Sequence, residues 1–590
     1  MKKTKLAVTP VALLLLSLTS CNLLSPKRNS VDVDGTIVIE PFANSSFGLS
    51  WIETMCSNWK KETGNSFNIL VKKNSTSLGG TQLETINSSN TDLYLASDCS
   101  YNAGFYKGYF EDLTDLLDVK PDGDSGKTIK EKIYDYNEWE KISSIVKYDA
   151  PAENVENKYA SEYFSYSGCY MLPYSSTFVG MLYNHDLFVE NGLMEYAKNT
   201  DEVKAELTKQ GIQFSAGANG RLYFVSSDHT TNFDEDDVIL SAGRDGKYGT
   251  YDDGQPETMS KFDTMLGKIM AKGDKPFIYA ESDEYITNLF YSYVIQKEGI
   301  DAYNALSKFN TNGKTIKLRD GTSTAIDYSN GYKAYAVDGI EEAANFFGKY
   351  FIDGNASTRY YQSKSTFGDA RDAFTVDTVK NGKLEIAVDG NWYLKGASDL
   401  LLSSGISDPS KADFRMMTLP EIEGQKGIPG NEHGAYINAP EQGGIAVRKQ
   451  KDPKKLEAIK SLITYILKDS TLSWITEETG MLLNYNYPMT DEALAKCSKF
   501  TRNCYEMFND QENIKSLPYR IDSLAAPMRY TSGVNPAYLI PFGNYDNNSL
   551  IVQMKGGSKG NKIADMVEST YNSSTWKTVL SQMMTMLGAE

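Results

Sequence analysis

Short apolar runs alternate with a helically periodic segment near the N-terminus. The apolar runs cover residues 35–40, 67–71 and 92–96 and are rich in β-branched residues. Between the first two, and as far as Gly64, apolar residues recur at helical spacing: Trp51, Ile52, Met55, Cys56 and Trp59. Strands that alternate with helices at this spacing predict a parallel, doubly wound sheet, so we expect an α/β fold.

Two acidic side chains follow strands of this predicted sheet. Glu40 ends the first strand, and Asp98 comes shortly after the third. Ligands on such sheets bind at the carboxyl ends of the strands. We therefore take Glu40 and Asp98 as candidate ligand contacts, with helix capping as the alternative role.

Helical periodicity returns in three later segments. One apolar stripe runs through residues 340–351, a second through residues 456–467, and a long helical stretch through residues 564–587. These stripes are predicted to pack on the core of the protein. The chain contains no internal repeats, which argues against an adhesin or another repetitive surface protein.

The N-terminal residues 1–20 have the pattern of an export signal. Three lysines precede an apolar run over residues 6–18 that is too short to span a bilayer. Small residues then lead to Cys21 in a pattern that resembles a bacterial lipobox, in which the cysteine becomes the acylated N-terminus. We predict a lipid-anchored tether at residues 21–33 on the extracytoplasmic face of the cell membrane. An ordinary signal peptide that happens to contain a cysteine is the alternative.

The size and charge of the chain narrow its class. A chain of 590 residues exceeds what one compact core holds, so two or more lobes are expected. The formal net charge of −17 becomes about −20 when the three lysines of the export signal are removed. Such an acidic protein lacks the basic patches that meet phosphates, so we expect no nucleic-acid partner. We also expect a monomer.

Six cysteines are present, one of which is assigned to the lipid. An odd number remains, and no spacing typical of a zinc site occurs. We expect mostly buried free thiols, and a local bridge between Cys497 and Cys504 is the alternative that the compartment permits. The remaining cysteines are Cys56, Cys99 and Cys169.

Three segments, in this order, carry a family pattern. Residues 170–188 contain an apolar-Pro-Tyr run followed by Leu-Tyr-Asn-His-Asp-Leu-Phe, with His185 where lysine is usual. Residues 380–392 include Gly-Lys-Leu and Asp-Gly-Asn-Trp, and residues 443–447 form a Gly-Gly-Ile-Ala-Val strand before a helix. Together they resemble the extracellular solute-binding proteins of ABC importers, the family that includes maltose-binding protein. Their order and spacing across residues 35–590 carry the resemblance, because each motif alone is weak.

The resemblance implies a two-lobe, periplasmic-binding-protein-like fold with a ligand cleft between lobes joined by crossing strands. Hinge closure would then sequester the ligand. The first crossing is expected at residues 173–178 and the second at Gly443 and Gly444. Lobe one would comprise residues 34–174 and 444–515, and lobe two residues 175–442 and 516–590.

Aromatic residues are the first candidates for sugar contact. The chain carries 39 Tyr, 24 Phe and 6 Trp, and aromatic rings suit the C–H faces of sugars, although most are expected in the core. By the resemblance, Trp392 matches the cleft tryptophan of the family. Trp51 begins a helix just after a strand-end loop, and Tyr285 is a further lobe-two candidate.

The crossings supply the remaining candidates. Tyr174 and Ser175 fall in the first crossing strand, where the resemblance places them facing the cleft. Tyr436 and Gly444 lie near the second crossing. All four are therefore expected ligand contacts.

The acidic loop from Asp245 to Asp252 partly fits a calcium-loop template. Gly246 stands where the template requires glycine, but Ser241 and Gly243 occupy its first and third positions, which breaks half of the pattern. A solvated surface loop is the better interpretation, and no other cofactor is expected.

These features predict a substrate-binding lipoprotein that captures an extracellular oligosaccharide and delivers it to a membrane permease. A secreted glycoside hydrolase is the competing class, because the chain has many carboxylates that could form a catalytic pair. However, neither HExxH nor GxSxG occurs. Another polar solute, such as a glycerol phosphate, is the second alternative. Its anionic group would need arginine or lysine in the cleft, whereas the candidate site is aromatic and acidic.

Overall fold

The computed structural model of the chain describes most of its residues. They are residues 35–41, 47–73, 86, 88–96, 107–149, 159, 161–225, 238–280, 284–352, 358–361, 367–439, 442–518, 524–525, 550–555 and 560–586. The predicted export signal, Cys21 and the tether lie outside the described residues, as do Asp98 and Cys99.

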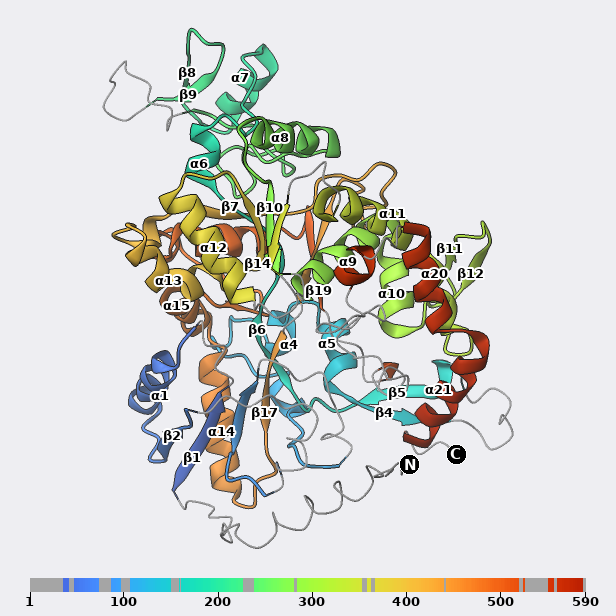
Figure 1. Cartoon of the computed structure of the whole chain (residues 1–590). Helices are drawn as coiled ribbons and strands as arrows, with labels where there is room; N and C mark the ends of the chain where they lie inside the picture. The colour runs from blue at the N-terminus through green and yellow to red at the C-terminus, as the bar shows by residue number, and fades with distance from the viewer. Residues whose placement is uncertain are drawn as a thin grey trace, which may run out of the picture.

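A six-stranded sheet forms the centre of the first lobe, at the bottom of Figure 1. Its strands are β1 (Thr36–Pro41), β2 (Asn68–Val71), β3 (Leu93–Ala96), β6 (Leu172–Ser176), β17 (Gln442–Val447) and β18 (Leu482–Leu483). They follow the order β18-β6-β17-β3-β1-β2. β1 pairs in parallel with β2 and β3, which confirms the predicted parallel arrangement. β17 runs antiparallel to β3 and β6.

Helices cover this first sheet because its central strands are apolar on both faces. Every residue of β1 is buried, as expected of a strand inside a covered parallel sheet. α1 (Ser50–Thr63) buries the whole predicted apolar stripe, and Gly64 ends it in the left-handed conformation with φ of 67°. α14 (Pro453–Ile466) and α15 (Asp469–Thr479) pack against α1.

A small subdomain extends the first lobe. It consists of α4 (Ile129–Lys132), α5 (Tyr136–Ser143), β4 (Ile145–Tyr148) and β5 (Phe164–Ser167). The indole of Trp139 in α5 donates a hydrogen bond of 2.9 Å to the carbonyl of Met171, just before β6. This buried bond fixes α5 to the first sheet.

A seven-stranded sheet forms the centre of the second lobe, above the first in Figure 1. Its strands are β7 (Val179–Asn184), β10 (Phe277–Ala280), β13 (Thr358–Tyr361), β14 (Ile386–Gly390), β15 (Phe414–Met417), β16 (Ala435–Ala439) and β19 (Ile514–Pro518). β10 runs parallel to β13 and β14, whereas β7 runs antiparallel to β14, β15 and β16. The second lobe is therefore also α/β.

The helices of the second lobe pack around this sheet. α9 (Glu284–Glu298) contacts β7, β14 and β16, and α12 (Phe367–Lys380) contacts β10 and β14. The others are α6 (His185–Glu190), α7 (Asp201–Lys209), α8 (Met259–Ala271), α10 (Ile300–Lys308), α11 (Asp338–Phe347), α13 (Tyr393–Ser403), α17 (Lys499–Asn509) and α19 (Leu550–Lys555), whereas α16 (Asp491–Lys496) packs on α15 of the first lobe. Short hairpins pair β8 (Phe214–Ala216) with β9 (Leu222–Phe224), and β11 (Thr315–Lys317) with β12 (Ser323–Ala325).

The C-terminal segment packs on the second lobe as two helices. We predicted one long helical stretch, but the structure has α20 (Gly560–Thr570), which packs against α11, and α21 (Ser573–Met586), which lies below α20 in Figure 1. The side chain of Asn572 accepts hydrogen bonds from the backbone N–H groups of Ser574 and Thr575. This cap starts a second helix and interrupts the predicted one.

The chain passes between the two sheets at two short linkers and one longer segment. One linker joins β6 to β7 between Ser176 and Val179, and another joins β16 to β17 between Ala439 and Gln442. The third passage lies between β18 and α17, because α17 packs against β15 and β19. The predicted boundary at residue 515 groups α17 with lobe one, and we now propose that lobe two begins again before Lys499.

Two further sequence predictions concern membranes and thiols. Within the described residues, no helix combines the length and apolar character needed to cross a bilayer. Cys56, Cys169, Cys497 and Cys504 are free thiols, so the alternative of a Cys497–Cys504 bridge is wrong for this structure. Burial raises the pKa of the Cys169 thiol to about 12, which leaves it protonated and unreactive.

Candidate ligand cleft

A pocket of about 210 Å³ lies between the two lobes, and we call it the cleft pocket. The first lobe contributes Phe47, which follows β1, and the C-terminal end of α15. The second lobe contributes the start of α13 and the start of α17. The lining residues are Phe47, Asn391, Leu394, Lys395, Ser398, Pro409, Ser410, Glu477, Glu478, Thr479, Gly480, Lys496, Ser498, Phe500 and Thr501.

The lobes approach each other closely at the end of α15. Gly480 caps this helix with φ of 77°, which favours glycine. A Cβ atom at Gly480 would stand 2.9 Å from the hydroxyl oxygen of Thr501, which begins α17 on the other lobe. Gly480 therefore meets both a conformational and a steric requirement at the edge of the cleft.

Trp392 stands at the carboxyl end of β14, where the chain turns into α13. Its indole lies over the backbone of Gly390, since a Cβ atom there would be 2.2 Å from the ring. The ring of Tyr285, at the start of α9, lies 5.3 Å from the indole, centroid to centroid, at an interplanar angle of 58°. The structure thus brings together two of the predicted aromatic residues, which are more than a hundred positions apart in the chain.

Asn391 links this aromatic pair to the first crossing, and sequence reasoning missed it. Its amide donates a hydrogen bond of 3.3 Å to the carbonyl of Ser176, and its carbonyl accepts one of 3.3 Å from the N–H of Phe178. Ser176 ends β6 in the first lobe. The only signal in the sequence was its position next to Trp392.

A buried ion pair supports the same strand end. The Arg371 guanidinium in α12 binds both carboxylate oxygens of Asp389, at 2.7 and 3.0 Å. Burial alone would lower the pKa of Arg371, but the Asp389 carboxylate raises it above its usual value. Two parallel hydrogen bonds fix the Asp389 carboxylate at the end of β14 in one orientation. Trp392 follows this strand end.

The first lobe presents a second aromatic pair beside the crossing. The rings of Trp51 and Tyr174 stack with centroids 6.3 Å apart and an interplanar angle of 21°. Ser175 follows Tyr174 in β6 and packs against Gly443, where a Cβ atom would lie 2.3 Å from the serine hydroxyl. Gly444 pairs with Ala96 and Pro173, so it lies inside the sheet beside these residues.

Two other predicted contacts have different surroundings in the structure. The Glu40 carboxylate accepts a hydrogen bond of 2.5 Å from the Thr91 hydroxyl and forms an ion pair of 2.9 Å with Lys72. It therefore joins segments that flank β2 and β3 in the first sheet, and its role as a ligand contact stays a prediction. Tyr436 is 1% exposed in β16, on the strand that packs against α9, and belongs to the core of the second lobe.

All four cleft aromatic residues are covered in this structure. Trp51, Tyr174, Trp392 and Tyr285 are between 4% and 7% exposed. None of the four lines the cleft pocket, although Asn391, next to Trp392, does.

In the acidic loop near Asp245, backbone N–H groups of the loop donate hydrogen bonds to its own carboxylates. Asp252 accepts hydrogen bonds from the N–H groups of Arg244 (2.7 Å) and Asp245 (3.1 Å), and Asp253 accepts one from Gly249 (2.7 Å). Among the described residues, no three acidic, histidine or cysteine side chains are arranged to hold a metal ion. The calcium interpretation gains no support from this geometry.

Two α/β sheets, short crossing linkers and a pocket between the lobes define a two-lobe, periplasmic-binding-protein-like fold. Among solved structures, the chain is similar to the GacH receptor of Streptomyces glaucescens, which was determined unliganded and with acarbose. The identity is 12% and the TM-score 0.45, over 92% of this chain and 98% of that one. It is also similar to a chitin oligosaccharide binding protein, at 12% identity and a TM-score of 0.48, over 93% and 100% of the two chains. No family model and no curated protein matches the sequence.

Proposed function

We propose that this protein is the substrate-binding lipoprotein of an ABC importer and that it captures an extracellular oligosaccharide by closure of its two lobes. In this proposal it has no enzymatic activity, and it passes the bound sugar to a membrane permease. Cys21 anchors it to the extracytoplasmic face of the membrane.

One observation carries the proposal: each lobe places a pair of aromatic rings beside the crossing. Trp51 and Tyr174 belong to the first lobe, and Tyr285 and Trp392 to the second. Flat aromatic faces bind the C–H surfaces of sugars, and closure of two such walls excludes water from the ligand. The four rings are covered here, so this proposal requires that an opening of the two lobes exposes them to the ligand.

The charges around the cleft pocket favour a neutral ligand. Two lysines and two glutamates line the pocket, and one pair of them, Lys496 and Glu477, lies 3.2 Å apart. A glycerol phosphate would need an excess of cationic groups there. The balance of charge therefore supports an uncharged sugar over an anionic solute.

Isothermal titration with maltotriose, triacetylchitotriose, cellotriose and xylotriose tests the proposal. We expect at least one sugar to bind and to change the tryptophan fluorescence, with no cleavage product on chromatography. The variant Trp392→Phe should weaken binding about tenfold, because the smaller ring loses aromatic contact area worth roughly 1 kcal/mol or more. Trp474→Phe, in a half-buried position of α15, is the matched control and should bind normally.

Three results would decide against this function. Failure of every sugar to bind would remove the oligosaccharide. Binding of glycerol 3-phosphate alone would make the solute anionic. Cleavage of a bound sugar that a single carboxylate substitution abolishes would establish a glycoside hydrolase.

The lipid anchor is tested separately in cells. The variant Cys21→Ser should lose incorporation of labelled palmitate and move from the membrane fraction to the soluble extracytoplasmic fraction. Unchanged labelling would show that Cys21 is not the acylated residue.

A further inference from the structure

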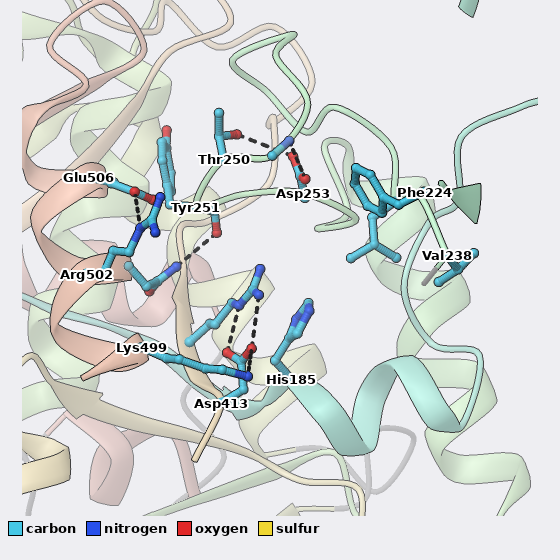
Figure 2. A pocket seen from close by; sticks show the side chains of 14 residues that line it. His185, Phe224, Val238, Thr250, Tyr251, Asp253, Asp413, Lys499, Arg502 and Glu506 are labelled. Atoms are coloured by element: carbon cyan, nitrogen blue, oxygen red, sulfur yellow. Dashed lines mark hydrogen bonds and ion pairs between the residues drawn. The ribbon is translucent and has the colours of Figure 1, made fainter. Parts of the chain in front are cut away.

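A second pocket, of about 400 Å³, lies on the second lobe away from the cleft. His185 lines this pocket and directly follows Asn184, the last residue of β7, whereas the first crossing leads into Val179 at the other end of the strand. At the usual rise per residue, six residues of strand put it roughly 20 Å from Val179. Figure 2 shows His185 beside Asp413 and Lys499, with Phe224 and Val238 on another wall.

Cationic groups of the second pocket share a single carboxylate. Arg415 in β15 binds Asp413 through Nε at 2.9 Å and Nη2 at 3.1 Å. Lys499, at the start of α17, lies 3.3 Å from the same carboxylate. One negative charge therefore faces two positive charges, and the Nη1 group of Arg415 is not used by this pair.

His185 adds a neutral donor. Gln255 donates a hydrogen bond of 3.4 Å to the Tyr183 hydroxyl, which leaves the hydroxyl hydrogen for Nδ1 of His185 at 3.4 Å. When the hydroxyl donates to Nδ1, the imidazole hydrogen lies on Nε2, which is the tautomer that donates into the pocket in this proposal. Burial and the nearby Arg415 lower the pKa of His185 to about 3, so the ring is neutral at physiological pH.

The other carboxylates of the second pocket are already engaged. Asp253 accepts a hydrogen bond of 2.7 Å from the N–H of Gly249, and Glu506 accepts one of 2.7 Å from Nε of Arg502. The pocket therefore has an excess of donors at Arg415, Lys499 and His185. Three acids, Asp253 among them, and three cations line the pocket, so its formal charges balance when Asp253 is ionised. The free donors therefore suit an acceptor with one negative charge, whereas a dianion would meet the nearby acids.

An apolar wall limits the ligand further. Phe224, Val238 and Leu240 line the pocket on segments near β9. We propose that the second pocket binds a small organic monocarboxylate with an apolar body. Its carboxylate accepts hydrogen bonds from Arg415, Lys499 and His185, and its apolar part packs on this wall. This site is separate from the cleft and does not depend on the proposed sugar.

Ligand-observed NMR and calorimetry with phenylacetate test the site on the full mature chain. We expect phenylacetate to bind with a dissociation constant on the order of 1 mM or tighter, given its size. Acetate, which lacks the apolar body, and 2-phenylethanol, which lacks the charge, should bind much more weakly. Equal binding of 2-phenylethanol, or binding of inorganic phosphate in place of phenylacetate, would overturn the proposal.

Two variants localise the binding. Lys499→Gln removes a half-exposed charge and should weaken phenylacetate binding about fivefold, and Arg415→Lys keeps the charge beside Asp413 but loses the planar fork. Lys496→Gln, an exposed lysine that lines the cleft pocket, is the matched control and should bind phenylacetate normally. Unchanged affinity in both test variants, or equal loss in the control, would place the ligand elsewhere. Sugar binding measured on the same variants reports on the cleft independently.

Discussion

An ion pair between the lobes allows lobe closure to be tested by mutation. Lys308, at the end of α10 in the second lobe, pairs with Glu138 of α5 in the first. The two side chains are 10% and 23% exposed, so water only partly screens the pair. Burial opposes ionisation of Glu138, but Lys308 and Lys141 hold its pKa below the usual value. The pair therefore stabilises the closed arrangement in which both residues meet.

The magnitude follows from this partial burial. Exposed pairs contribute up to about 1 kcal/mol, and breaking a fully buried pair costs about 3–5 kcal/mol. We expect about 1.4 kcal/mol for Lys308 and Glu138, which corresponds to a tenfold change in the ratio of closed to open molecules. If sugar binds only to the closed form and the unliganded protein is mainly open, Lys308→Gln should weaken sugar binding about tenfold.

Lys141→Gln is the matched control for this variant. Lys141 lies 3.3 Å from the same carboxylate, but it belongs to the same helix as Glu138 and does not join the lobes. Calorimetry should show near-normal sugar affinity for Lys141→Gln, and small-angle scattering of the unliganded native protein should show the mainly open state on which the tenfold estimate depends. Equal losses of affinity in both variants, or none in either, would refute the role of this pair in closure.

Two further predictions concern stability. Gly443→Ala should lower the free energy of unfolding by about 1–3 kcal/mol, because its Cβ atom would overlap the Ser175 hydroxyl; an unchanged Tm would show that β17 moves aside. Burial raises the pKa of Asp253 to about 7, so the folded state favours the protonated carboxyl. The stability gained from that protonation is complete below about pH 4 and is lost as pH rises through 7. The Tm of Asp253→Asn minus the Tm of the native protein should therefore be more positive at pH 8 than at pH 4.5. The opposite order would contradict the raised pKa.

Local periodicity predicted the start of the first lobe well. The apolar runs became β1, β2 and β3, and the helical stripe became α1 with Gly64 as its cap. Side-chain spacing follows directly from backbone geometry, so each of these segments carries its own signal. The C-terminal helices were less well predicted, because the Asn572 cap interrupts a stripe that remains apolar on both sides.

The candidate site was predicted only in part. Trp392 and Tyr285 were each named from the sequence, but their contact depends on the packing of α9 against the strand end of β14. The sequence did not indicate the partners of Glu40, Lys72 and Thr91, because they come from neighbouring segments of the first sheet. Sequence position identifies a strand end, but it does not say whether a neighbouring strand already supplies a partner for the acid.

The sequence by itself predicted the strands and the first helix at the start of the first lobe, and the apolar stripes of residues 340–351 and 456–467. It also contains the export pattern and Cys21, on which the predicted anchor depends. Only the tertiary structure decided which residues meet across the lobes, such as Asn391 with Ser176 or Glu138 with Lys308. Periodicity is a property of a few consecutive residues, whereas these contacts depend on how two sheets far apart in the chain are placed against each other.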